Sequence, residues 1–253
     1  MNVKDKITIV TGAASGLGRA TCHALVAAGA KVVGFDLDPK VEDIVQMPNL
    51  RGMVVNVADD ASVKAGIDAV VAMHGAVHVA VNCAGILGPR KMISRGELFP
   101  SELWERVIGV NLTGTFNVIR HATLAMSRNA PDEKGERGVI VNTASGAAWQ
   151  GQMGQAAYSA SKAGVIGMTL PIARDLAEHG IRIVAIAPGL FDTAMASDIP
   201  PKVAEKLIHN MVLFPERMGQ AEEFAGLVRH IVENAYINAT TISIDGGGRV
   251  GTR

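Results

Sequence analysis

Tyr158 and Lys162 are the pair whose residue types and spacing point most directly to chemistry. Four positions separate them, so on a helix both side chains lie on one face. A free tyrosine has a pKa of about 10 and is a poor base at neutral pH. A neighbouring ammonium favours the phenolate, lowers that pKa and makes the pair a general acid and base. The same spacing also occurs on solvated helix faces, so this interpretation needs support from other residues.

Two polar residues upstream extend the candidate site. Ser145 precedes Tyr158 by 13 residues and follows an apolar run, and Asn111 lies further upstream in Asn-Leu-Thr-Gly. The segment 159–162 also satisfies S-x-x-K, the motif of serine acyl-enzymes, but neither S-D-N nor K-T-G accompanies it, so a serine hydrolase is disfavoured. The seven histidines show no H-E-x-x-H or paired-ligand spacing, so we expect no metal site.

A glycine-rich loop precedes these residues, at Thr11–Gly18 in the pattern T-G-x-x-x-G-x-G. Glycines allow a tight turn and let a pyrophosphate approach the backbone closely. The helix that follows offers free N–H groups and a partial positive charge at its N-terminus. Because the loop lies between a predicted strand and a predicted helix, the pattern indicates a dinucleotide site.

Asp36 follows the second predicted strand, 18 residues after Gly18. A carboxylate at this place accepts hydrogen bonds from the adenosine ribose hydroxyls of NAD and repels the 2′-phosphate of NADP. Residues 13–15 supply no compensating basic side chain. An exposed turn aspartate is the simpler alternative, but the position favours NAD as the cofactor.

The elements that must position these residues alternate along the chain. Short runs rich in Val and Ile predict strands covered on both faces, and helical spacing predicts helices between them. This order predicts an α/β fold: a single Rossmann-type domain over residues 1–253 with a doubly wound, parallel, seven-stranded sheet and helices on both faces. The predicted strands are Ile7–Val10, Lys31–Phe35, Met53–Val55, Val77–Val81, Val139–Val141, Ile181–Ala187 and Thr241–Ile244. The predicted helices are Gly16–Ala28, Asp60–Met73, Pro100–Met126, Gln155–Ala177 and Gln220–Val232, the third with a turn-like Thr113-Gly114 inside it.

Three segments depart from this alternation. Gly88–Phe99 and Gly189–Asn210 follow strand ends, where ligands bind in open α/β sheets. We expect both to be substrate loops, and the second to form a lid rather than an ordinary connection. Asn129–Gly138 is charged and contains glycine, which predicts a solvated loop.

Composition argues against several functional classes. Lys plus Arg and Asp plus Glu both number 24, so no basic surplus favours a nucleic acid or an anionic membrane as partner. Cys22 and Cys83 form no disulfide framework and no C-x-x-C pattern, which fits a reducing compartment. We expect a cytoplasmic protein without a signal peptide or a membrane span.

The glycine loop and the four polar residues together resemble the short-chain dehydrogenase/reductase family. Thr11–Gly18 matches the family's cofactor motif, and Asn111, Ser145, Tyr158 and Lys162 match its catalytic tetrad in order and approximate spacing. The resemblance implies that Tyr158 takes the alcohol proton while the nicotinamide takes the hydride. It also implies that Ser145 binds the substrate oxygen, that Lys162 holds the nicotinamide ribose, and that Asn111 orders a water linking Lys162 to solvent.

The same resemblance implies a set of cofactor contacts. Asn56 stands where the family often has Asp, and its amide oxygen can still accept a hydrogen bond from adenine. Asn82 would brace the central sheet. The expected cofactor-binding residues are Gly12, Ser15, Gly16, Leu17, Gly18, Asp36, Asn56, Val57, Asn82, Cys83, Ala84, Gly85, Tyr158, Lys162, Pro188, Gly189, Phe191 and Thr193.

Longer strings narrow the resemblance within the family. Gly138–Ser145, Gly151–Lys162, Gly167–Leu176 and Ile186–Phe191 resemble the members that oxidise 3-hydroxyacyl-CoA to 3-oxoacyl-CoA with NAD. Ser145, Gln152 and Tyr158 would then contact substrate, with Gln152 near the thioester carbonyl. A reductase of 3-oxoacyl carriers that uses NAD(P)H, a hydroxysteroid dehydrogenase and a non-catalytic NAD-binding regulator remain as alternatives. Acyl chain length, 2-methyl preference and physiological direction are left open.

The resemblance also implies a homotetramer. The helices Gln155–Ala177 and Pro100–Met126 would form one two-fold interface, and the strand Thr241–Ile244 with Asp245–Gly248 would form the second. The first of these helices is rich in small residues, which allow close helix packing, although some of them must pack on the sheet.

Overall fold

The computed structural model describes residues 1–44, 47–193 and 201–249, and seven strands of this part of the chain form one parallel sheet. The strand order is β3-β2-β1-β4-β7-β8-β9, so the connections change direction between β1 and β4. Ligands bind at such a switch point in open α/β sheets. The strands are β1 (Ile7–Thr11), β2 (Lys31–Asp36), β3 (Leu50–Val54), β4 (Val79–Asn82), β7 (Gly138–Thr143), β8 (Ile181–Pro188) and β9 (Thr241–Ile244).

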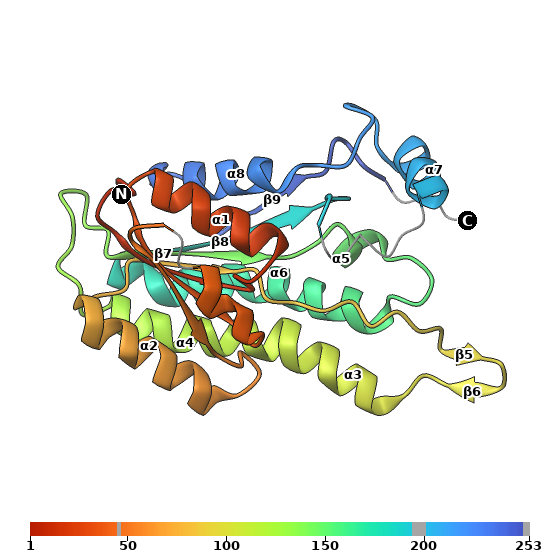
Figure 1. The fold of residues 1–253 in the computed structure, drawn as a ribbon, viewed down its shortest axis with the longest axis horizontal. Coiled ribbons are helices and arrows are strands. Elements are labelled where there is room, and N and C mark those ends of the chain that lie inside the picture. The colour runs from red at the N-terminus through yellow and green to blue at the C-terminus, as the bar shows by residue number, and fades with distance from the viewer. Residues whose placement is uncertain (45–46, 194–200, 250–253) are drawn as a thin grey trace.

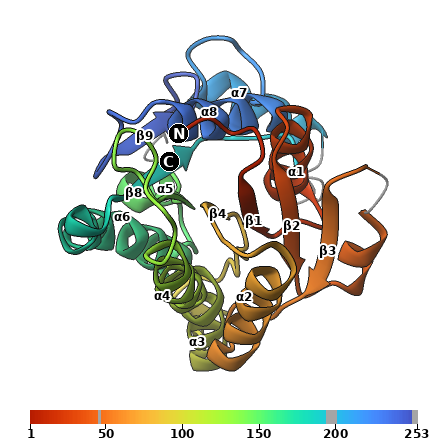
Figure 2. The same ribbon diagram turned by 90° about the vertical axis from the view of Figure 1, so that its left-hand side faces the viewer.

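Helices cover both faces of this sheet (Figures 1 and 2). Neighbouring residues of a strand point to opposite faces, so Val10 packs under α1 (Gly16–Ala27) and α8 (Ala221–Glu233), and Ile9 packs on the other face. That face carries α2 (Asp60–His74), α4 (Thr115–Met126) and α6 (Ala156–Leu176). The predicted doubly wound α/β fold is confirmed.

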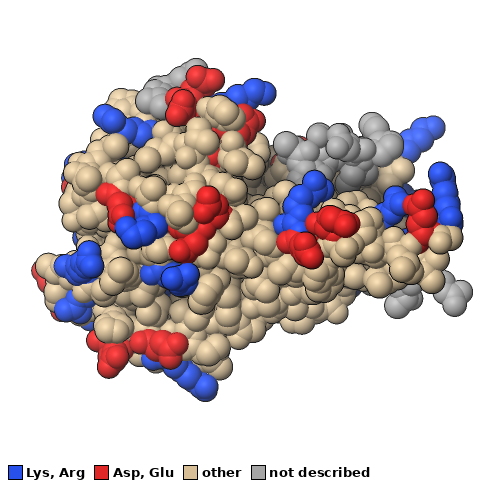
Figure 3. Space-filling model, turned by 90° about the horizontal axis from the view of Figure 1, so that it is seen from below, with Lys and Arg blue, Asp and Glu red and all other residues tan. Residues whose placement is uncertain are grey.

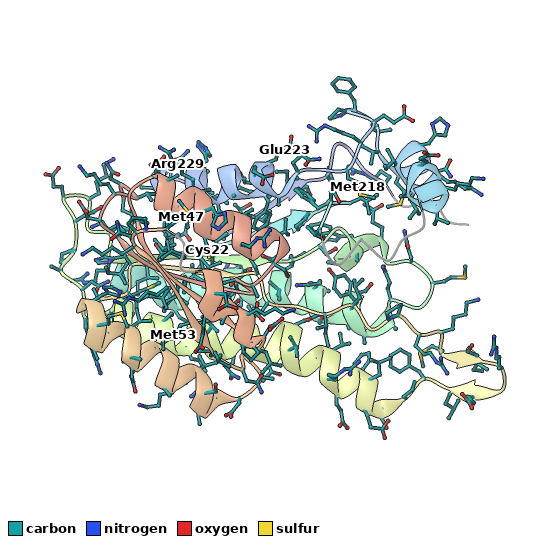
Figure 4. All side chains as sticks on the ribbon, viewed as in Figure 1. Cys22, Met47, Met53, Met218, Glu223 and Arg229 are labelled. Carbon is teal, nitrogen blue, oxygen red and sulfur yellow. The ribbon has the colours of Figure 1, made fainter. Side chains whose placement is uncertain are left out.

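Cys22 is one of the residues by which α1 packs on the sheet. Its side chain points from α1 toward the sheet (Figure 4) and is fully buried among aliphatic residues. Cys22 therefore acts as a small apolar core residue.

Several segments differ from the sequence prediction. The long helix predicted at Pro100–Met126 consists of α3 (Ser101–Ile108), a π-helical turn η2 (Gly109–Gly114) and α4. The turn-like Thr113-Gly114 therefore marks a widened helical turn rather than a break. The third strand begins three residues earlier than predicted, at Leu50. Short elements that had no clear periodicity are η1 (Pro39–Ile44), α5 (Ala147–Gln150) and η3 (Ala177–His179).

The two predicted substrate loops contain regular structure. Gly88–Phe99 holds a small antiparallel hairpin, β5 (Ile93–Ser94) and β6 (Glu97–Leu98), which projects from the body of the molecule (Figure 1). Gly189–Asn210 was predicted to be irregular, but its last part belongs to α7 (Pro201–Met211), and residues 194–200 lie outside the described part.

The prediction of a solvated loop at Asn129–Gly138 is wrong for Glu136. Its side chain is 6% exposed and pairs at 2.7 Å with the guanidinium of Arg182 on β8. That guanidinium also donates to the carbonyls of Ile231, Val232 and Ile237. Arg182 is a buried charge and needs these acceptors, so the loop is drawn inward and ties β8 to the end of α8.

His78 occupies the opposite edge of the sheet from the strand carboxyl ends. Its Nδ1 accepts a hydrogen bond from the backbone N–H of Ile7 at 3.1 Å, so the folded protein uses the neutral imidazole. Burial, with a smaller contribution from the charge of Lys6, lowers the pKa of His78 to about 4. An unfolded histidine has a pKa of about 6.5.

This difference makes stability depend on pH. Between pH about 6.5 and about 4 the unfolded chain binds a proton at position 78 that the folded chain does not, so the free energy of unfolding should fall as the pH falls. In His78→Asn, the amide oxygen can accept from Ile7 without titrating, so that slope should shrink. Urea unfolding at several pH values measures it, and His23→Asn, on the exposed side of α1, is the control. Equal slopes in wild type and His78→Asn would contradict this assignment.

Candidate active site

A cleft of about 510 Å³ opens at the carboxyl ends of the strands, beside the switch point between β1 and β4. Segments spread along the chain from Gly12 to Gly248 line it. Of the residues predicted for the site, only Asn82, expected to bind cofactor, and Asn111, expected to be catalytic, lie outside its lining. Those that line it are Gly12, Ser15, Gly16, Leu17, Gly18, Asp36, Asn56, Val57, Cys83, Ala84, Gly85, Ser145, Gln152, Tyr158, Lys162, Pro188, Gly189, Phe191 and Thr193.

The glycine loop owes its path to close backbone approach. Gly12 has φ of +68°, and a Cβ there would lie 2.9 Å from the backbone nitrogen of Ala84. A Cβ at Gly18 would overlap the carbonyl oxygen of Gly12. Ser15 begins α1 without a capping hydrogen bond from its side chain to any described residue, and the first turn of α1 has no acidic residue. The first N–H groups of α1 therefore suit an anion in the cleft.

Asp36 is held at the rim of the cleft by two backbone groups. Its Oδ2 accepts from Ala14 N–H and its Oδ1 from Asp38 N–H, both at 3.0 Å. The carboxylate therefore belongs to the end of β2 and to the glycine loop at once, which an ordinary exposed turn aspartate would not. Each oxygen keeps a further lone pair for a hydroxyl donor.

Asn56 has a similar local arrangement on the neighbouring strand end. Its Oδ1 accepts from the N–H of Ala58 at 3.1 Å, and its own N–H donates to Ser62. The amide oxygen thus orients the turn after β3 and retains capacity for one more donor.

Polar side chains join β4 to its neighbours below the cleft. Thr11 Oγ1 accepts from the N–H groups of Cys83 and Ala84 at 3.1 Å each. The amide of Asn82 donates to Asn142 on β7 at 2.9 Å, and both side chains are buried. Asn82 therefore braces the central strands from inside the protein, as expected, without lining the cleft.

Ser145 and Tyr158 lie beside each other in one wall of the cleft. Ser145 Oγ accepts from Ala147 N–H at 3.1 Å, which leaves the serine proton free to be donated. Burial raises the pKa of Tyr158, and the hydrogen bond with Ser145 opposes that rise. Sequence reasoning expected Lys162 to lower this pKa, but the protein groups alone keep the phenol neutral.

The contacts of Lys162 explain why it does not lower the pKa of Tyr158. Its side chain is buried, its Nζ donates to the carbonyl of Thr143 at 2.7 Å, and it lies 5.7 Å from the centre of the Tyr158 ring. Burial lowers the pKa of Lys162 to about 8, with a small opposing effect from Cys83. The ammonium is therefore oriented by the sheet edge and not by the phenol oxygen.

Asn111 lies behind the cleft, on the π-helical turn η2, with no exposed surface. Its amide donates to the carbonyl of Ile86 and to Ser161 Oγ at 2.9 and 3.1 Å, and its oxygen accepts from Ile86 N–H at 2.8 Å. The side chain thus holds the loop after β4 against α6.

The part of the cleft lined by Gln152 also includes residues that were not predicted from the sequence. Leu207 and Met211 lie one turn apart on α7 and line the cleft with Val212. Gln152 Nε2 reaches Met211 Sδ at 3.5 Å, so this contact bridges the two sides of the opening. The i, i+4 spacing of Leu207 and Met211 was a usable signal, but the segment was read as a loop. Further lining residues are Thr143, Gln150, Gln155, Asp245 and Gly248.

The described residues offer neither a candidate metal site nor a candidate membrane-spanning helix. No group of three or more His, Cys, Asp or Glu side chains in that part of the chain could hold a metal ion. No helix there combines the length and the apolar character that crossing a bilayer requires.

Known proteins resemble this chain over almost its full length. It is 46% identical to the 3-hydroxyacyl-CoA dehydrogenase type-2 of Rattus norvegicus and to that of Homo sapiens, over 98% of this chain and 97% of each of those proteins. A 3-oxoacyl-[acyl-carrier-protein] reductase of Thermotoga maritima is 36% identical over 98% of this chain and 99% of that protein.

A solved structure and a family model agree with these similarities. The crystal structure of a 3-hydroxyacyl-CoA dehydrogenase type-2 from Mycobacterium avium superposes with a TM-score of 0.93, at 34% identity, over 100% of this chain and 98% of that one. The family model for short chain dehydrogenase matches residues 6–204. These matches bear out the resemblance on which the site was predicted, and the chain belongs to the short-chain dehydrogenase family.

Proposed function

We propose that this protein oxidises a 3-hydroxyacyl-CoA to the 3-oxoacyl-CoA with NAD as hydride acceptor. The observation that carries the proposal is the convergence of Ser145, Tyr158 and Lys162 on one wall of the cleft whose other end holds the glycine loop and Asp36. Family membership supports a nicotinamide cofactor, and the relatives named for 3-hydroxyacyl-CoA support the substrate class.

The chain's own groups suit the cofactor. The N-terminus of α1 would take the diphosphate, Asp36 the adenosine ribose hydroxyls, and Asn56 with Val57 the adenine. Lys162 would hold the nicotinamide ribose, next to Gly85 and Thr143 on the cleft floor. When bound, oxidised nicotinamide supplies the carbon that accepts the hydride and a positive charge that lowers the pKa of Tyr158.

Ser145 and Tyr158 would handle the proton. The Ser145 hydroxyl is oriented by Ala147 N–H and would donate to the substrate oxygen. The substrate hydroxyl would then lie between Ser145 and Tyr158, whose phenolate takes its proton as the C–H bond is broken. The reverse transfer from the phenol serves reduction, so direction depends on the cofactor and substrate supplied.

The remaining wall suits an acyl thioester. Leu207, Met211 and Val212 form an apolar side of the cleft, which favours an aliphatic chain. The Gln152 amide would exchange its weak contact with Met211 for the thioester carbonyl, a better acceptor.

Three alternatives are less well supported. A carboxylate at position 36 disfavours the 2′-phosphate of NADP, and so a reductase that uses NADPH. Nothing in the cleft favours a steroid over an acyl chain. A non-catalytic NAD-binding regulator would not need Ser145, Tyr158 and Lys162 together. Cytoplasmic location stays a prediction, for which the two free cysteines are the support.

The first prediction tests the reaction. A panel of 3-hydroxyacyl-CoA thioesters, a hydroxysteroid and a free secondary alcohol is assayed by NADH absorbance, and the thioesters should give the highest kcat/KM. Tyr158→Phe should lower kcat about 10²–10⁴-fold, because the proton acceptor is lost, while NAD binding measured by calorimetry stays close to wild type. Near-native turnover by Tyr158→Phe, or a preference for the steroid, would refute the proposal.

The second prediction concerns Asp36. Wild-type kcat/KM should favour NAD over NADP strongly, and Asp36→Asn should narrow that ratio on the order of tenfold to a hundredfold by removing repulsion of the 2′-phosphate. Asn keeps one acceptor oxygen, which can still bind Ala14 N–H, and gives up the hydrogen bond from Asp38 N–H, so the glycine loop stays attached to β2 while the charge is removed. Equal use of both cofactors by the wild type would rule this out.

The third prediction concerns assembly. The face formed by α2, α3 and α4 has a broad uncharged area between groups of charged side chains (Figure 3). On α3, α4 and α6, Trp104, Phe116, Leu124 and Leu170 are each 42–55% exposed, more apolar surface than one folded chain needs. We infer a homotetramer in which the exposed faces of α3, α4 and α6 form one interface and β9 with Asp245–Gly248 forms the second.

Light scattering should therefore give about four times the chain mass of 26.5 kDa. Leu124→Lys should reduce the mass to that of a dimer by placing charges in one interface. Val54→Lys on β3, with comparable exposure, is the control and should leave the tetramer intact. A fully active wild-type monomer would contradict the assembly.

A further inference from the structure

Ser161 lies on α6 between Tyr158 and Lys162 but has no surface in the cleft. Its side chain is fully buried. Its hydroxyl donates to the backbone carbonyl of Tyr158 at 2.7 Å and accepts from the amide of Asn111 at 3.1 Å. Both partners are at the candidate active site, while Ser161 itself would touch neither cofactor nor substrate.

The bonds of Asn111 extend this connection to the sheet. Its amide oxygen accepts from Ile86 N–H and its nitrogen donates to Ile86 carbonyl, in the loop that leaves β4. The second N–H of the amide goes to Ser161, so both donors of Asn111 are used. A buried series of hydrogen bonds thus runs from the end of β4 through η2 to the backbone of Tyr158.

Close packing makes this series sensitive to small changes. A Cβ at Gly164, one turn after Ser161, would lie 2.9 Å from the side chain of Leu112, so α6 and η2 are already at their closest approach. A hydroxyl removed from Ser161 leaves a buried donor on Asn111 without its acceptor, and the turn cannot close further to compensate.

We propose that Ser161 is a positioning residue of the active site: through Asn111 and the Tyr158 carbonyl it fixes the turn of α6 that aims Tyr158 at Ser145 and Lys162 at Thr143. The consequence for turnover rests on the proposed function, whereas the consequence for the Tyr158 phenol does not. The hydrogen bond from Ser145 opposes the rise in the pKa of Tyr158. If this turn of α6 is held less firmly, that hydrogen bond weakens and the pKa of Tyr158 rises further.

The chain offers a matched control two residues away. Ser159 is on the same helix, and its hydroxyl is also buried but has no hydrogen-bond partner among the described residues. Ser159→Ala therefore removes the same atom from the same helix without breaking a hydrogen bond.

The test uses the phenol of Tyr158 directly. The chain has two tyrosines, and Tyr236 is fully exposed, so Tyr236→Phe leaves Tyr158 as the one tyrosine whose phenolate absorbance is titrated. In this background Ser161→Ala should raise the midpoint of that titration by about 0.5–1 pH unit. It should lower kcat about tenfold and change the KM for NAD less than about threefold. Ser159→Ala should leave all three values as they were.

Ser161→Cys keeps nearly the same volume with a poorer donor and acceptor, so it should fold and give a smaller shift in the same direction if Ser161→Ala proves unstable. Melting temperatures and circular dichroism accompany each variant. Titration and kcat that match between the Ser159 and Ser161 variants would overturn the proposal. A shifted titration in a protein that oxidises no 3-hydroxyacyl-CoA would support the positioning role and refute the proposed function instead.

Discussion

The buried ammonium of Lys162 is the group on which the arrangement of the cleft depends. A charge held away from water is costly unless it is hydrogen-bonded, and the acceptor here is the carbonyl of Thr143 at the end of β7. This bond sets the position of α6 relative to the carboxyl edge of the sheet. Because Tyr158 lies one turn before Lys162, the same bond determines that the phenol faces Ser145, which follows β7 directly.

The opposite side of α6 is held by a different kind of contact. The π-helical turn brings Asn111 inward, where its amide can reach both Ile86 and Ser161. An ordinary α-helix through this region would not place one residue against both the sheet exit and α6 in the same way. Helix α6 is thus held from the sheet by the ammonium of Lys162 and from η2 by the amide of Asn111.

The two ends of the cleft are built in different ways. At one end, the side chains of Asp36 and Thr11 accept hydrogen bonds from backbone N–H groups of the glycine loop and of the residue after β4, so the geometry is tied to the strand ends. At the other end, segments that are far apart in sequence meet side chain to side chain, as Gln152 meets Met211. The first end can hold the same ligand in many proteins of one fold, while the second can vary with the substrate.

Local patterns in the chain were enough to predict the alternation of strands and helices, the glycine loop and the common face of Tyr158 and Lys162. Those features depend on residues within a few turns of one another, where steric preference and periodicity decide the outcome. Three features could not be read in this way: the buried Glu136 in a charged loop, the partners of Asn111, and the upward direction of the Tyr158 pKa. Each depends on groups distant in sequence: Arg182 draws Glu136 inward, Ile86 and Ser161 hydrogen-bond to Asn111, and burial in the assembled cleft wall raises the pKa of Tyr158. Burial and hydrogen-bond partners are properties of the assembled fold. A sequence motif identifies a titrating group, but these properties determine its pKa and therefore its chemistry.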